Sequence, residues 1–116
     1  MSRWIWNDVE LEVNMGDVDF VEKYEKAFTK MEKTEDDLKK VGLNSEFIKG
    51  YYNMFLTLFD DLFGEGTAEK LFKGKRDINQ VEDCYYSFIE VAKQDVAETN
   101  KRRAKKMTKY AVKSGR

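Results

Sequence analysis

The chain has no histidine and no proline among its 116 residues, and it has one cysteine, Cys84. Without histidine it lacks the commonest general base and the commonest neutral metal ligand of proteins. A lone cysteine without a histidine partner is a poor nucleophile and forms no intrachain disulfide, so we expect Cys84 to be a small core residue in a reducing cytoplasm. These absences argue against catalysis, and we expect neither enzyme activity nor a cofactor.

Features of metal sites and membrane proteins are also missing from the sequence. The aspartate pairs 36–37 and 60–61 occupy neighbouring positions on expected helices, so their carboxylates point about 100° apart and do not converge on an ion. No apolar run approaches the roughly 20 residues that a membrane-spanning helix needs. The first residues do not resemble a secretion signal. We therefore expect no metal site and no membrane association.

Charge is unevenly distributed along the chain, although the formal net charge is only -1. Eight of the 21 basic residues follow Asn100, where there is no acidic residue. Residues 1–100 therefore carry 13 basic and 22 acidic residues, a net charge of -9. We expect residues 1–100 to form a single helical domain with an N-terminal hairpin, and residues 101–116 to form a basic C-terminal tail or helix extension.

The most apolar part of the chain is a predicted helix that begins at the capping residue Ser45 and ends at Gly64. Its apolar positions span roughly 200° of a helical wheel, about twice the arc that usually faces a core. Such a helix is either central to the fold or shared with a partner. One flank carries four large apolar residues, namely Tyr52, Leu56, Phe59 and Phe63. If the rest of the chain leaves them uncovered, they form a protein-binding groove or an oligomer interface; the alternative is that they belong to the core.

Alternating apolar residues near the start of the chain predict a β-hairpin with strands at 4–6 and 9–13. A two-residue turn at Asn7-Asp8 would place four apolar side chains on one face of the hairpin. The expected pairs are Trp6 with Val9 and Trp4 with Leu11. A lone hairpin is marginal in water, so this one should pack on a helix.

Three further helices are expected. The first begins after the cap Asp17 and is ended by Gly42; a short one at 68–72 is capped by Thr67, and the last begins at Asp77. The expected buried stripe of the last helix comprises Ile78, Val81, Tyr85, Phe88, Val91 or Ala92, and Val96. The fold class is therefore mainly α, a four-helix domain with an N-terminal β-hairpin.

The basic segment after Asn100 has two interpretations. Its densest part could meet nucleic-acid phosphates or an acidic protein face, and the residues concerned are Lys101, Arg102, Arg103, Lys105 and Lys106. Apart from Tyr110 it has no interleaved aromatic residues on which bases could stack. The other interpretation is a solvated helix end whose cations favour the negative helix terminus.

The run FDDLFGEGTAEKLF at residues 59–72, followed by Gly74-Lys75, resembles a family of small proteins from tailed phages and prophages of Gram-positive bacteria. This family is regarded as tail assembly chaperone-like. The resemblance extends over roughly residues 4–95, and its most specific part is Phe-Gly-Glu-Gly-Thr at 63–67. Lys73 stands where a second glycine is expected in the family.

This resemblance implies a protein of the bacterial host cytoplasm that binds the tape measure protein, or another tail protein, during tail assembly. A wide apolar helix could shield apolar helices of that partner. The residues that we expect to bind the partner are the four apolar ones on the flank of the central helix. The resemblance implies no catalytic residues. A homo-oligomer, a nucleic-acid-associated phage protein that uses the basic tail, and a structural tail component remain as alternatives.

Overall fold

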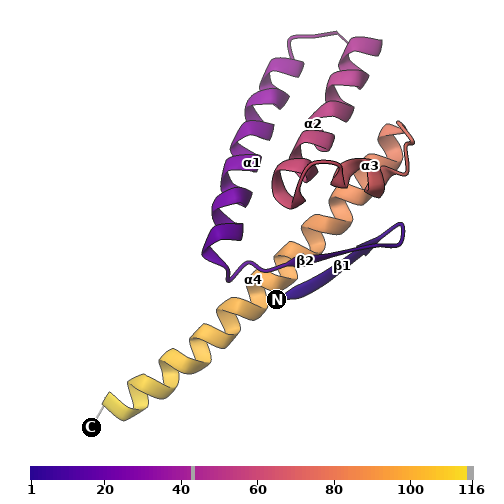
Figure 1. Ribbon diagram of the computed structural model, residues 1–116. Coiled ribbons are helices and arrows are strands. Elements are labelled where there is room, and N and C mark those ends of the chain that lie inside the picture. Colours follow the sequence, from indigo (N-terminus) through magenta and orange to yellow (C-terminus); the bar gives the residue numbers. More distant parts are fainter. Residues whose placement is uncertain (43, 115–116) are drawn as a thin grey trace.

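The computed structural model describes residues 1–42 and 44–114, with side chains as far as residue 108. Within these ranges there are four helices and one two-stranded antiparallel sheet, which confirms the predicted fold class. The elements are β1 (Ser2–Trp6), β2 (Val9–Val13), α1 (Val18–Leu38), α2 (Ser45–Phe63), α3 (Thr67–Phe72) and α4 (Ile78–Ser114). Figure 1 shows α1 and α2 side by side, α3 across the end of α2, and α4 running beneath them and on past the other elements.

The hairpin has the predicted register. Trp6 pairs with Val9 and Trp4 with Leu11. Asn7 and Asp8 have φ angles of 48° and 66°, the left-handed pair that a two-residue hairpin turn with the correct twist requires. The Asn7 side chain also donates a hydrogen bond to the Leu71 carbonyl at 2.7 Å, which fastens the turn to α3.

Trp4 joins the hairpin to the helical core. Its side chain is 1% exposed and lies 5.5 Å from Phe59, 6.0 Å from Phe63 and 5.2 Å from Phe88 between ring centroids. The indole Nε1 donates to Ser87 Oγ at 3.0 Å, so the one polar atom of the ring is satisfied. The hairpin thus packs on α2 and α4 together, as its marginal stability alone led us to expect.

The boundaries of α1 and α2 follow local capping chemistry. Asp17 caps α1, as predicted, by accepting from the Asp19 amide. The helix ends at Leu38 and does not reach Gly42, because the backbone amides of residues 39–41 donate hydrogen bonds to carbonyls of its last turn. For α2 the predicted cap is wrong by one residue. Asn44 accepts from the Phe47 amide at 3.1 Å, and Ser45 is already the first helical residue.

The Gly-Glu-Gly-Thr segment makes the sharp corner between α2 and α3. Gly64 and Gly66 have φ angles of 111° and 90°, conformations that cost glycine little. The prediction that Thr67 caps α3 is wrong. Thr67 is the first residue of the helix, and Asp60 of α2 supplies the missing acceptor by bonding to the Ala68 amide at 2.9 Å. The most specific part of the family resemblance is therefore a structural corner.

Helix α4 begins after Asp77, which accepts from the Asn79 amide at 2.9 Å. Of the predicted buried stripe, Val81, Phe88 and Ala92 are buried, and Ile78 and Tyr85 are half-buried against the core. Val96, by contrast, is 36% exposed, and Asp95 takes the buried position. The helix continues without a break beyond Asn100 to Ser114. Hereafter, residues 1–100 are called the body and residues 101–114 the α4 extension.

Candidate protein-binding site

The flank of α2 proposed as a partner-binding face is covered in the folded chain. Tyr52 is 7% exposed and Phe59 is fully buried, while Leu56 and Phe63 are half-buried and packed on the core. The covering groups are Trp4 of the hairpin over Phe59 and Phe63, and Phe72 of α3 against Tyr52 and Phe59. Of the two alternatives for this flank, the core is the one observed, and the four side chains form no open groove.

The wide apolar arc of α2 has a simple structural reason. Helix α2 packs against α1, α3 and α4, and Trp4 closes the remaining side between α2 and α4. A helix with neighbours on several sides needs apolar side chains over a wider arc than a surface helix does. The arc therefore indicates a central position in the fold.

The basic residues of the extension are all accessible. Side chains of residues 101–108 are exposed, including the five cations at 101, 102, 103, 105 and 106. Figure 1 shows the extension continuing past the rest of the molecule. Only some of these cations lie beside the body, and those are close to the first turns of α1.

A cleft of about 510 Å³ lies between the start of α1 and the junction of the body with the extension. Its lining consists of Met15, Gly16, Val18, Val21, Glu22 and Glu25 on one side and Thr99, Arg102, Arg103 and Lys106 on the other. The lining thus combines apolar side chains and two carboxylates on the α1 side with three cations on the α4 side. Val18 is 71% exposed within it, one of the largest exposures of any apolar side chain in the described chain.

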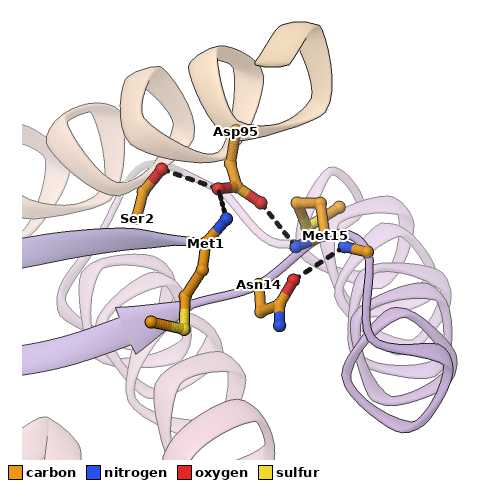
Figure 2. A network of polar contacts seen from close by, with 6 residues as sticks. Met1, Ser2, Asn14, Met15 and Asp95 are labelled. Carbon is orange, nitrogen blue, oxygen red and sulfur yellow. Dashed lines mark hydrogen bonds and ion pairs between the residues drawn. The ribbon is translucent and has the colours of Figure 1, made fainter. Parts of the chain in front are cut away.

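One buried carboxylate holds the segment before α1 against α4 (Figure 2). Asp95 accepts from the Met15 amide at 2.6 Å through Oδ2. Its Oδ1 accepts from the Ser2 hydroxyl at 2.6 Å and lies 2.9 Å from the terminal ammonium of Met1. Next to it, the Asn14 side chain accepts from the Gly16 amide at 3.0 Å, which shapes the turn into α1. Asp95 therefore positions the residues that form one wall of the cleft.

These contacts also decide the charge of Asp95. Burial raises its pKa, but the hydrogen bonds from Ser2, the terminal ammonium and the Met15 amide together outweigh burial and bring the pKa below its ordinary value. Asp95 is thus ionised at neutral pH, and its charge is matched by donors. It acts as a structural anchor.

The remaining chemistry of the described residues is sparse. Burial raises the pKa of the Cys84 thiol to about 12, so the group is protonated and enclosed by the core, in agreement with the prediction. Among the residues the structure describes, no three histidine, cysteine or acidic side chains are grouped as metal ligands would be. No helix in the described part of the chain has the length and apolarity needed to cross a membrane.

A family model described as "Family of unknown function (DUF6673)" matches residues 7–116. The chain belongs to this family. No curated protein and no solved structure matches the chain significantly. The DUF6673 model runs through the hairpin turn, all four helices and the basic extension, so the extension is part of the region that defines the family.

Sequence reasoning missed both the apolar lining of the cleft and the role of Asp95. One local signal was available, because Val18 is apolar but lies off the helical stripe of Val21, Tyr24, Phe28 and Met31, on a side of α1 where the other exposed residues are charged or polar. The cleft itself requires residues 15–25 to meet residues 99–106, and no local pattern predicts that meeting.

Proposed function

We propose that this DUF6673 protein acts without catalysis as a phage tail assembly chaperone or scaffold in the cytoplasm of a bacterial host. Its partner in this proposal is an apolar helix of the tape measure protein or of another tail protein. The observation that carries the binding part is the cleft between α1 and the α4 extension. The assignment to phages rests on the resemblance of residues 59–75. The binding surface that we propose is this cleft, in place of the flank of α2.

The chemistry of the cleft suits an amphipathic helix. Met15, Val18 and Val21 contribute apolar surface to the lining, and covering the exposed part of Val18 would stabilise a complex by about 1–2 kcal/mol. The carboxylates come from α1 and the cations from α4, so a helix with complementary charged flanks would bind in one orientation.

A second candidate function is nucleic-acid binding, which the accessibility of Lys101, Arg102, Arg103, Lys105 and Lys106 favours. The two functions respond differently to salt. Phosphate contacts release counterions, so nucleic-acid affinity falls steeply as salt rises, whereas apolar burial is much less affected. A structural protein of the finished tail would use the same cleft and differ only in remaining within the virion.

The test is co-expression with a phage tape measure protein, followed by size-exclusion chromatography at low and high salt. We expect co-elution that survives high salt and is lost in Val18→Asp. The matched control is Ile48→Asp, which changes an exposed aliphatic residue in the first turn of α2 and should leave co-elution intact. Salt-sensitive retention of nucleic acid without co-elution would favour the second function, and equal loss in both variants would refute the cleft.

A further inference from the structure

A second cleft, of about 490 Å³, lies further along α1, and Glu25 lines both this cleft and the one beside Val18. We call it the acidic cleft. Aromatic rings and carboxylates dominate its lining, which includes Tyr24, Phe28, Tyr85, Glu25, Glu32 and Glu35. No lysine or arginine is among the described residues that line it. No ion pair found within the described part of the chain involves its three carboxylates, so their charge is available to a partner.

The aromatic part of the acidic cleft is built from three rings that pack on the core. The ring centroids of Tyr24 and Phe28 are 4.4 Å apart, and those of Phe28 and Tyr85 are 6.3 Å apart. Burial raises the pKa of Tyr85 to about 12, and the negative charge of Glu35 adds a smaller contribution. An aromatic face attracts a lysine or arginine side chain, and a neighbouring carboxylate attracts it further. The acidic cleft therefore suits cationic side chains.

The two clefts form a continuous trough between α1 and α4. The α1 residues that line them include a row at spacings of three and four, which places them along one side of the helix, namely Val18, Val21, Glu25, Phe28, Glu32 and Glu35. The opposite wall comes from α4, with Tyr85 in the acidic cleft and residues 99–106 in the cleft beside Val18. From Val18 to Glu35 the row is roughly 25 Å long, the length of a helix of about five turns.

We propose that the partner helix continues from the cleft beside Val18 into the acidic cleft, and that its segment there carries lysine or arginine side chains over Tyr24 and Tyr85. This inference rests on the proposed function and adds the charge pattern of the partner. Acidic residues of the helix lie near the three cations of α4, and its basic residues lie among the three carboxylates of the acidic cleft. A helix that is acidic at one end and basic at the other binds in one direction only.

Two synthetic amphipathic peptides of about 18 residues test the charge pattern. Both have a leucine face; the first carries lysines in one half and glutamates in the other, and the second has the same composition with alternating charges. We expect the full chain to bind the first peptide about tenfold more tightly in fluorescence anisotropy, because only this peptide matches both clefts. Glu32→Lys combined with Glu35→Lys should remove this preference, since attraction to the basic half becomes repulsion.

The matched control combines Asp37→Lys with Glu65→Lys. Both residues are exposed and neither lines a cleft, so this variant has the same net charge as the test variant and should keep the preference for the first peptide. Circular dichroism checks that both variants remain helical. Equal binding of the two peptides by wild type, no binding of either, or loss of the preference in both variants would overturn the proposal.

Two further outcomes separate this inference from its alternatives. Self-association of the full chain that disappears in the Glu32→Lys, Glu35→Lys variant would assign the acidic cleft to the basic extension of another copy and overturn the proposal. Co-elution of the tape measure protein that depends on Val18, without any preference between the peptides, would refute the charge pattern and leave the proposed function standing. A preference that requires Glu32 and Glu35, without co-elution, would support the trough and refute the tape measure protein as the partner.

Discussion

Replacing Asp95 with asparagine should reveal how strongly the N-terminal segment is anchored to α4. The carboxylate accepts hydrogen bonds from the Ser2 hydroxyl and the Met15 amide and pairs with the terminal ammonium. An asparagine has one acceptor oxygen, so in either orientation its NH₂ group faces a donor. Because the ammonium side of the pair is 65% exposed and therefore screened, we assign most of the loss to the hydrogen bonds. We expect a destabilisation of about 2 kcal/mol, or roughly 8 °C in Tm for a chain of this size.

The pH dependence of this effect follows from the lowered pKa of Asp95. A carboxylate whose folded pKa lies below its ordinary value of 3.8 stabilises the fold above that value, and this contribution is lost as pH falls through the folded pKa. The free energies of unfolding of wild type and Asp95→Asn, measured with urea, should therefore differ by a constant amount between about pH 5 and pH 7. The two values should converge below about pH 4. The exposed Asp83→Asn is the matched control, with a change within about 0.5 kcal/mol. Equal stability of Asp95→Asn and wild type at pH 7, or a gap that widens in acid, would refute the reasoning.

Three further changes test other parts of the fold. Trp4→Ala removes the ring that contacts three phenylalanines and should cost about 3–5 kcal/mol in urea unfolding; a loss below about 1 kcal/mol would contradict its central role. Lys73→Gly should stabilise the chain by about 1 kcal/mol in the same assay, because Lys73 has a left-handed φ of 52° and its ion pair with Asp8 is solvent-exposed. Cys84 should resist a thiol reagent until urea unfolds the protein; rapid reaction of the native state would contradict its burial and its raised pKa of about 12.

The fold was largely predictable because its signals are local. The register of the hairpin follows from alternating side chains around Asn7-Asp8, and both features lie within a few residues of each other. The helices follow from capping residues such as Asp17 and Asp77 and from apolar spacing. The errors at Ser45 and Thr67 arose where another capping group competes, the adjacent Asn44 in one case and the more distant Asp60 in the other.

The candidate site was far less predictable because it depends on contacts between distant segments. The width of the α2 arc is equally consistent with a binding face and with a central helix, and only the packing of Trp4 and Phe72 decides between them. From the sequence alone, Asp95 looks like an ordinary exposed aspartate, because its hydrogen-bond donor Ser2 lies 93 residues away in the chain. A buried charge needs its donors, and a sequence pattern does not reveal them.

The central claim is that a partner helix lies in the cleft beside Val18. Site-specific photo-crosslinking tests it most directly, with a photoreactive amino acid placed at position 18 or, as the control, at position 48, in cells that co-express the tape measure protein. The account predicts a covalent product with the tape measure protein from position 18 and none from position 48. A product from position 48 alone, or no product from either position while the two proteins co-purify, would contradict it.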